Sequence, residues 1–433
     1  MIELINIILQ IIYIYFLTLF PLREIHFNKK KGNLITHLDV ASVNLSLHIF
    51  LLLCFSFFPI DLIYIFYGQL IIGSIFMYKL IFKNKNFFLN TSNVIHFSLF
   101  LVITFVLSID LAANLKLGWD SQFRWIVKAL NFYQGNSLEN LINFSGPEYP
   151  HFGSYLWSYF WKISYLDYEY TGRIFYIALF SISIFSFCEI FDTNKFISSM
   201  ISIIIILIGY KYLFFNGYQD IIIFCFLLFV SKSLYLILYK NNQHKIHYAL
   251  MIVNLILVSW IKTEGFLYAL FILMILILLD KNKNVKLLFS LVFIFLILSK
   301  LLTYQIFDFP ISLQGETYSK PILDFNYTIL IDRFLLVVKF YMIFLFNNLL
   351  MLFSILALIY LIFSNFKVKI VKFLTLFFIL NASFILGSHL FMNIGNIDYW
   401  ITHTIPRFML QTTGIYIISI VLIYNINLKK KNK

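Results

Sequence analysis

Acidic and basic side chains gather where several long apolar stretches of this sequence end. Gly118-Trp119-Asp120-Ser121 directly follows one such stretch. Arg124 and Lys128 lie four and eight residues after Asp120, on one face if the segment is helical. A carboxylate beside cations can accept the proton of a hydroxyl group while the cations stabilise a developing anion. The simpler alternative is that Asp120 caps the helix that follows it.

A second motif combines two prolines with an acid and a histidine. Pro147-Glu148-Tyr149-Pro150-His151 predicts a rigid turn, because each proline fixes its backbone. Aromatic residues follow the motif, as expected of an interfacial belt: Tyr155, Trp157, Tyr159 and Trp161. The belt and the turn alone explain the pattern as well as a site would. His151 by itself is weak evidence of a base or a metal ligand.

Two later motifs carry both signs of charge. Gly217-Tyr218-Gln219-Asp220 has no cation nearby in sequence, so Asp220 either caps a helix or pairs with Lys262 from another helix. Lys262-Thr263-Glu264-Gly265 lies between two apolar stretches that are joined by almost no loop. Charged groups at membrane depth are costly and mark candidate functional sites. A local ion pair at a tight turn is the alternative for Lys262 and Glu264.

The last group of ionisable residues precedes the final apolar stretch: His389, Asp398, His403 and Arg407. Arg407 directly follows a proline. Arginine can bind phosphate with two parallel hydrogen bonds, which favours a phosphate-binding role. An arginine in such a position can also extend harmlessly to the membrane surface.

The composition predicts that these motifs belong to an all-α polytopic membrane protein. Of the 433 residues, 61% are hydrophobic and 12% charged, and the mean hydropathy is +0.87. Soluble domains carry about 25% charged residues, so soluble, disordered and coiled-coil classes are excluded. The three cysteines lie in apolar stretches without metal-ligand spacing, so we expect them to be packing residues.

The apolar stretches predict about 13 transmembrane helices, since a span needs about 20 apolar residues. They are 4–20, 44–60, 61–82, 94–114, 172–191, 196–214, 219–239, 247–261, 265–280, 287–304, 346–364, 371–389 and 408–427. Near-continuous apolar runs do not fit the alternating strands of a β-barrel. The first stretch lacks a basic start and a cleavage site, so we interpret it as a retained helix.

The distribution of charge predicts the orientation of these helices. One set of connections, with its helix ends, has a net charge of +15, and the other set has −3. Lys232 lies inside an apolar stretch and contributes the remaining +1 of the formal net charge of +13. The basic side should be cytoplasmic. The N-terminus is then outside, the C-terminus inside, and no nucleic acid is needed to explain the positive charge.

All the motifs described above fall on the predicted outer side. That side has two long loops, about 115–171 and about 305–345. The segment 327–345 predicts a helix lying in the outer interface, because Asp332, Arg333 and Lys339 interrupt an apolar background. We expect one continuous membrane unit. The family resemblance described next implies that 1–93 are additional N-terminal helices and that 94–433 are the catalytic part.

From about residue 94 the chain resembles the GT-C class of membrane glycosyltransferases, particularly the bacterial branch related to protein O-mannosyltransferases and aminoarabinose transferases. The resemblance is carried by Trp119-Asp120, by Tyr149-Pro150, by the two later motifs and by Arg407. One departure is that Ser121 stands where some members carry a second acid. Asp110 and Glu148 are the candidates for that second acid.

The resemblance implies transfer of a sugar from a polyprenyl-phosphate donor to a lipid, glycan or protein acceptor, with inversion, at the outer face of a bacterial inner membrane. Asp120 would be the base. Lys262, Arg407 and Arg124 would bind the donor phosphate. The supporting or substrate-binding residues would be Asp220, Glu264, Tyr149, His151, Tyr218 and Glu148. A divalent metal held by Asp220 and Glu264 is possible and is not assigned.

Two other classes fit a polytopic protein of this kind. A transporter or lipid flippase favours charges deep within spans and related repeats. An O-antigen ligase or polymerase depends chiefly on outer arginines and a histidine. The aspartate at the start of the first outer loop favours the glycosyltransferase over both.

Overall fold

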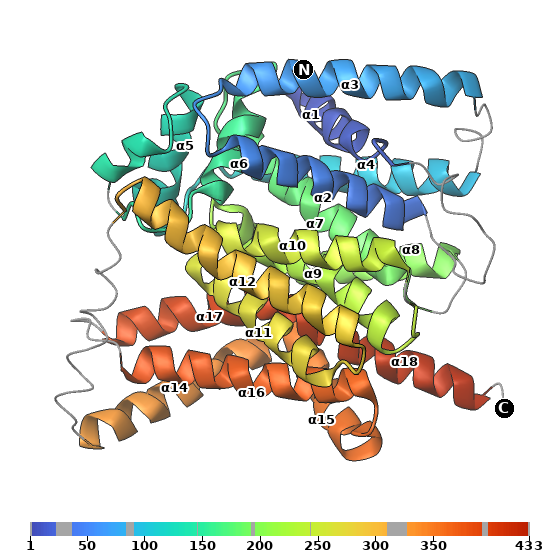
Figure 1. Cartoon of the computed structure of the whole chain (residues 1–433), viewed down its shortest axis with the longest axis vertical. Helices are drawn as coiled ribbons and strands as arrows, with labels where there is room; N and C mark the ends of the chain where they lie inside the picture. Colours follow the sequence, from blue (N-terminus) through green and yellow to red (C-terminus); the bar gives the residue numbers. More distant parts are fainter. Residues whose placement is uncertain are drawn as a thin grey trace. The chain divides into compact units, whose positions relative to one another are not determined.

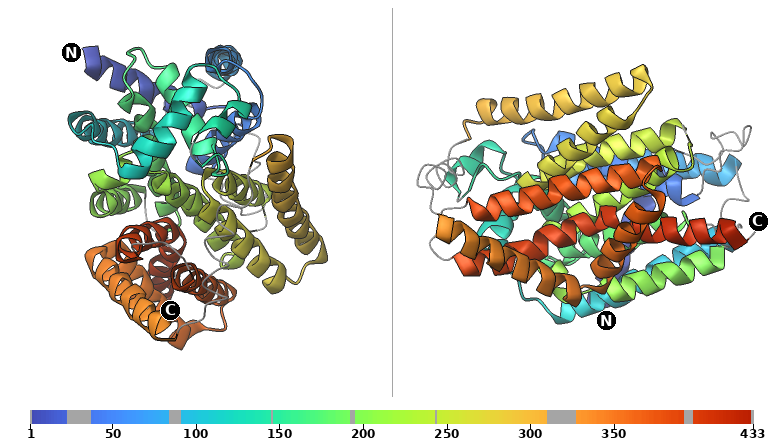
Figure 2. Two further views of the ribbon diagram at one scale, coloured as in Figure 1. Left: turned by 90° about the vertical axis from the view of Figure 1, so that its left-hand side faces the viewer. Right: turned by 90° about the horizontal axis from the view of Figure 1, so that it is seen from below.

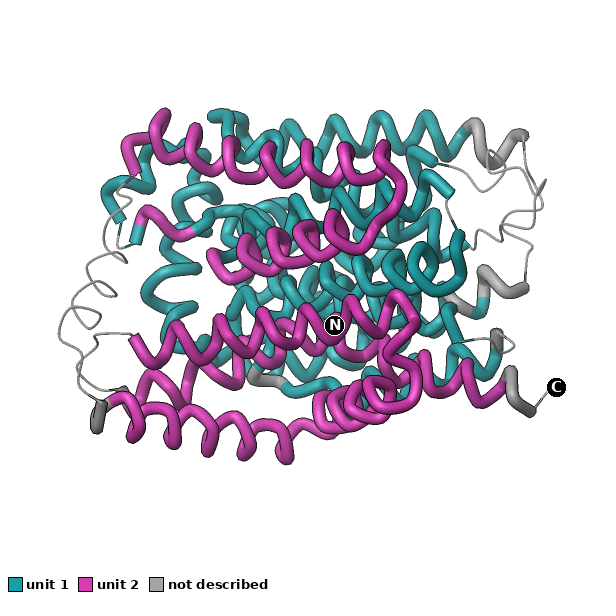
Figure 3. The backbone as a smooth tube through the Cα atoms, turned by 60° about the horizontal axis from the view of Figure 1, so that its bottom comes forward, with its two compact units in different colours: residues 1–146, 150–262 teal, residues 147–149, 263–433 magenta. Residues whose placement is uncertain are grey.

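The computed structural model describes residues 2–22, 37–83, 91–144, 146–191, 195–242, 244–309, 327–391 and 397–431. Every regular element among these residues is a helix (Figure 1). Residues 310–326 of the second predicted outer loop lie outside the described part, as do 23–36 of the first predicted cytoplasmic segment and Lys433 at the basic C-terminus. The helices form two compact units, 1–146 with 150–262, and 147–149 with 263–433 (Figure 3).

The first unit contains ten α-helices and three shorter helical turns among its described residues. The α-helices are α1 (Ile2–Leu17), α2 (His37–Phe55), α3 (Leu62–Lys83), α4 (Thr91–Ala113), α5 (Ile126–Tyr133), α6 (Phe152–Lys162), α7 (Tyr170–Cys188), α8 (Lys195–Gly209), α9 (Asp220–Leu238) and α10 (Lys245–Ile261). The turns are η2 (Ser121–Trp125), η3 (Glu139–Asn143) and η4 (Tyr212–Phe215).

Helix α7 is the centre of the first unit. All of its residues are buried, and it packs against α1, α2, α4, α6, α8 and α9. Short polar side chains link the surrounding helices: the Ser42 hydroxyl donates to Ser186 at 2.7 Å, and the Gln10 amide donates to the Phe160 carbonyl at 2.8 Å. Such hydrogen bonds help membrane helices to associate, because an apolar side chain gains little by contacting another helix in place of lipid. They also tie the N-terminal helices α1 and α2 into this unit.

The second unit contains seven described α-helices. They are α11 (Thr263–Leu279), α12 (Lys283–Ile306), α14 (Tyr327–Asn347), α15 (Leu349–Asn365), α16 (Lys369–Leu390), α17 (Ile397–Tyr416) and α18 (Ile418–Lys431). Helices α11 and α12 form a hairpin, and α14 packs along α16 and α17 (Figure 2). The Asn381 amide donates to the Tyr416 hydroxyl at 3.0 Å and so joins α16 to α17.

The break at Asn348 turns the chain sharply. Helices α14 and α15 differ in direction by 106°. The Asn348 side chain caps α15 by accepting from the Met351 N–H at 3.2 Å. The predicted helix at 327–345 therefore exists as part of α14, and its position in the outer interface stays a prediction.

The apolar helices identify a membrane protein. Six helices in the described residues are long and apolar enough to cross a bilayer, or seven if the bent pair is one span. Six shorter apolar helices accompany them, of which Ile2–Leu17 is the first and Thr263–Leu279 the last. Each of the thirteen predicted stretches coincides with helical structure. The lengths support a smaller number of spans than thirteen, so that count stays a prediction.

Contacts divide the chain at Lys262, whereas the sequence suggested a functional division at residue 93. The two divisions describe different properties, because a unit defined by packing need not be a unit of function. The functional division stays a prediction.

Candidate functional site

Asp120 lies at the entry of an irregular helical segment. It is 8% exposed and directly precedes the π-helical turn η2, which continues into α5. Its side chain makes no capping hydrogen bond, which removes the simplest structural explanation for an aspartate there. Single π-helical turns occur frequently at functional sites, because they re-aim a side chain within a helix.

Two glycines bring the Asp120 motif against the Asp220 motif. The Gly118 N–H donates to the Asn216 carbonyl at 2.9 Å, and a Cβ on Gly118 would lie 2.6 Å from the Tyr218 ring. Gly217 has a φ of +90°, and a Cβ there would lie 2.9 Å from the Cβ of Ser121. Only glycine permits this approach at both positions. Two motifs about 100 residues apart in sequence therefore form one packed loop pair.

The structure pairs Asp220 with Lys262. The Lys262 ammonium donates to the Asp220 carboxylate at 3.0 Å, and the two residues are 3% and 2% exposed. Asp220 is the first residue of α9, and the cap position is occupied by Gln219. The cross-helix pairing is therefore confirmed over the N-cap alternative. The backbone at Lys262 is extended and separates helix α10 from helix α11. This break in the helix allows the Lys262 side chain to reach Asp220.

Arg173 holds this region together and was not among the predicted site residues. It is fully buried, forms a two-bond ion pair with Glu169 at 2.8 and 2.9 Å, and donates to the carbonyls of Leu115 and Phe215. Burial raises the pKa of the Glu169 carboxyl, and Arg173 opposes that shift. The sequence signal was the four-residue spacing of Glu169 and Arg173 at the start of an apolar stretch.

Arg124 and Lys128 differ in their surroundings. Arg124 lies half-buried in η2. Lys128 is fully buried, and its ammonium donates to the Gly146 carbonyl at 2.7 Å. This hydrogen bond joins α5 to the segment that precedes the 147–151 motif, so Lys128 has a structural role.

His151 is a packed side chain in this structure. It is 2% exposed, its Nε2 lies 2.8 Å from the Ser56 hydroxyl, and its ring contacts Phe57, Phe132 and Trp260. Within the part of the chain that the structure describes, no three His, Cys, Asp or Glu residues are placed to hold a metal ion. The metal role suggested for Asp220 and Glu264 stays unassigned.

The remaining predicted residues belong to the second unit. Tyr149 is half-buried in the short segment 147–149, and Glu264 is the second residue of α11. Arg407 lies half-buried within α17, inside the apolar helical stretch Asp398–Leu428. The expectation that Arg407 ends a loop before the final span is wrong, because the helix already begins at Ile397.

The two candidates for the second acid differ clearly. The Asp110 carboxylate accepts hydrogen bonds from the Tyr210 hydroxyl and from the Asn114 amide, the latter at 3.2 Å. One carboxylate oxygen of Glu148 is buried without a hydrogen-bond partner among the described residues. Glu148 also lines a cavity of the second unit. The identity of the second acid therefore stays a prediction.

Lys232, expected as a lone charge inside a span, has two acidic partners. Its ammonium lies 2.7 Å from Asp39 and 2.9 Å from Glu189, and it donates to the Ser186 hydroxyl at 3.1 Å. Asp39 falls in the predicted cytoplasmic connection at 21–42. In the structure it is buried within α2, which begins at His37, so the helix starts earlier than predicted. The cluster is buried in the first unit, between α2, α7 and α9.

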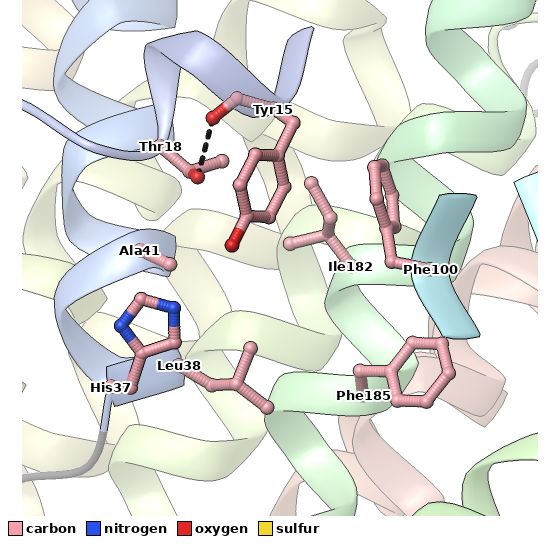
Figure 4. A pocket seen from close by; sticks show the side chains of 8 residues that line it. All are labelled: Tyr15, Thr18, His37, Leu38, Ala41, Phe100, Ile182 and Phe185. Atoms are coloured by element: carbon pink, nitrogen blue, oxygen red, sulfur yellow. Dashed lines mark hydrogen bonds between the residues drawn. The ribbon is translucent and has the colours of Figure 1, made fainter. Parts of the chain in front are cut away.

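An apolar crevice in the first unit does not offer a further site. It measures about 20 Å³, room for about one water molecule, and lies between Tyr15, His37, Phe100 and Phe185 (Figure 4). The only hydrogen bond drawn there runs from the Thr18 hydroxyl to the Tyr15 carbonyl at 2.6 Å.

Comparisons of the chain with protein-family models, with curated proteins and with solved structures each find no match.

Proposed function

We propose that this protein is an integral-membrane glycosyltransferase. It transfers a sugar from a polyprenyl-phosphate donor to a lipid, glycan or protein acceptor, with inversion. The reaction takes place at the outer face of a bacterial inner membrane, as part of cell-envelope synthesis. The proposal includes a GT-C-like arrangement with thirteen spans, the outer loop at 115–171 and an interfacial helix at 327–345.

The observation that carries this proposal is the loop pair around Asp120. Asp120 sits beside a π-helical turn whose loop packs on the loop that leads to Asp220, and Asp220 holds the buried ammonium of Lys262 at 3.0 Å. A carboxylate that could accept a proton and a buried, oriented cation meet the two needs of transfer from a phosphate donor.

In the proposed reaction the acceptor hydroxyl attacks the anomeric carbon of the sugar. Asp120 accepts the hydroxyl proton as the new C–O bond forms. The bond between the anomeric carbon and the phosphate oxygen breaks, and its electron pair leaves with the polyprenyl phosphate. Lys262, with Arg124, stabilises the charge on that leaving phosphate. The family resemblance implies the same role for Arg407. Tyr149, Tyr218, Glu264 and His151 would support the site or contact substrate.

Substitution of Asp120 tests the catalytic assignment. Asp120→Asn should lower transfer from a polyprenyl-phosphate sugar by about 10²-fold or more, because the general base is removed. Membrane insertion and the elution of the purified protein should stay unchanged. Glu139→Gln, an exposed acid of the same loop, is the matched control and should keep full activity. Near wild-type transfer by Asp120→Asn contradicts the proposal.

The phosphate-binding roles are tested through donor dependence. Lys262→Ala and Arg407→Ala should each raise the donor concentration needed for half-maximal transfer, since a charge-assisted bond to phosphate is lost. If neither variant changes the donor dependence, the assignment of these two residues is wrong.

The buried cluster of Lys232, Asp39 and Glu189 favours a second candidate, an ion-coupled transporter. Ionisable residues that pair inside a membrane domain often mark ion pathways. A flux assay in liposomes separates the two candidates. Proton or ion flux that depends on Lys232 and is unaffected by Asp120→Asn would support the transporter.

A further inference from the structure

The second unit contains an open cavity of about 390 Å³, within the size range of small-molecule sites. Thr263, Phe266 and Leu270 line it from α11. Their spacing of three and four residues places them on one face of that helix. The facing wall comes from α12 and has the same helical spacing: Ile297, Lys300, Leu301 and Tyr304. Glu148 closes the polar end.

The polar end of the cavity presents one acceptor and one cation. A carboxylate oxygen of Glu148 is buried and makes no hydrogen bond within the described residues. The Tyr304 hydroxyl donates to the main-chain carbonyl of Glu148, which fixes the segment that carries this carboxylate. Lys300 is 8% exposed, and its ammonium lies 5.9 Å from the ring centre of Phe266. A ligand that donates from a hydroxyl group and carries an anion would match both groups.

The apolar end of the cavity opens on the surface of a membrane helix. Leu301 lines the cavity and is also 55% exposed. The outer face of α12 is apolar and exposed at Leu291, Ile294 and Leu298. Only 11% of the apolar window of α12 is buried, so this helix borders lipid. A ligand can therefore leave its acyl chains in the bilayer while its head enters between α11 and α12.

We propose that this cavity binds a lipid whose headgroup carries a phosphate and a free hydroxyl group. The phosphate faces Lys300, the hydroxyl donates to Glu148, and the chain passes over Phe266, Leu270 and Leu301. The cavity is formed by residues of the second unit. Its test measures lipid labelling and needs no sugar transfer, so it can fail or succeed separately from the proposed function.

Photo-crosslinking in lipid nanodiscs tests the site. The full chain is placed in phosphatidylcholine nanodiscs with a small fraction of diazirine-bearing phosphatidylglycerol, and the labelled peptides are identified by mass spectrometry. We expect labels on α11 and α12 around Leu270 and Ile297. Glu148→Gln and Lys300→Met should each lower this labelling by about tenfold, the value of one charge-assisted hydrogen bond. Leu270→Trp should also lower it, because the larger side chain narrows the cavity.

The control variant is Leu298→Trp, which adds the same bulk to the exposed face of α12 and should leave labelling unchanged. Equal labelling by a diazirine-bearing phosphatidylcholine would overturn the proposal, because it would indicate only bulk lipid contact. Competition by millimolar inorganic phosphate would identify a site for free anions and overturn the lipid assignment. Equal competition by a polyprenyl phosphate, which lacks the hydroxylated head, would also overturn it.

Discussion

Lys262 and Asp220 show how one buried ion pair positions a membrane site. Removing two charges from water costs several kcal/mol each, so such a pair contributes little net stability. The role of this ion pair is to position a group: it fixes the Lys262 ammonium at the point where α10 ends and the backbone becomes extended. The sequence offered this pairing as one of two alternatives, because few opposite charges are available at this depth, and it did not decide between them.

A double-mutant cycle tests this pair. Lys262→Met should destabilise the protein by about 3–5 kcal/mol, since it leaves a buried carboxylate without its cation. Asp220→Leu should destabilise it by a similar amount. The double variant should recover most of the loss, because no unpaired charge remains. Denaturation in detergent micelles measures all four proteins, and strictly additive losses would contradict the coupling.

Other residues could not be assigned from sequence. His151 looked like a possible base, but its ring is enclosed by aromatics that come from Phe57, Phe132 and Trp260, far apart in sequence. Arg173 was overlooked because its carbonyl partners, Leu115 and Phe215, are backbone groups that no residue type reveals. Side-chain chemistry is visible in a sequence, whereas backbone partners appear only with the fold.

At the scale of secondary-structure elements, the sequence predicted where helices form, but some of the predicted helix starts are wrong. Long apolar runs predicted the helices, because a helical segment satisfies all of its backbone hydrogen bonds internally when it lies in lipid. Asp39 and Arg407 precede the apolar stretches predicted to begin at residues 44 and 408, yet both lie within helices. Asp39 is accommodated by Lys232. The π-helical turn after Asp120 had no signal, because it depends on how the neighbouring loop packs.

Gly217 and Gly135 together test the loop contact that orients Asp120. Both have positive φ, but a Cβ on Gly217 would meet Trp157 at 2.7 Å and Ser121 at 2.9 Å, whereas Gly135 has open space. Gly135→Ala should cost only backbone strain, about 1 kcal/mol. Gly217→Ala should cost about 1–3 kcal/mol more through overpacking and should lower sugar transfer. Equal effects on stability and transfer would contradict the role of this contact.

At the scale of the whole molecule, the predicted orientation rests on the charge difference between the two sides. Single cysteines test it in intact cells after Cys54, the exposed native cysteine, is replaced by serine. Asn136→Cys lies in the first predicted outer loop and Lys281→Cys in a predicted cytoplasmic turn, and both positions are exposed. A membrane-impermeant maleimide should label position 136 and spare position 281. The reverse pattern would invert the topology.

The central claim is that this membrane protein consumes a polyprenyl-phosphate sugar. The most direct measurement supplies a radiolabelled polyprenyl-phosphate sugar to the purified protein in liposomes and follows the release of unglycosylated polyprenyl phosphate. The account predicts release by the wild type with a membrane-lipid extract as acceptor, and little release by Asp120→Asn. No release by the wild type, or equal release by Asp120→Asn, would contradict it.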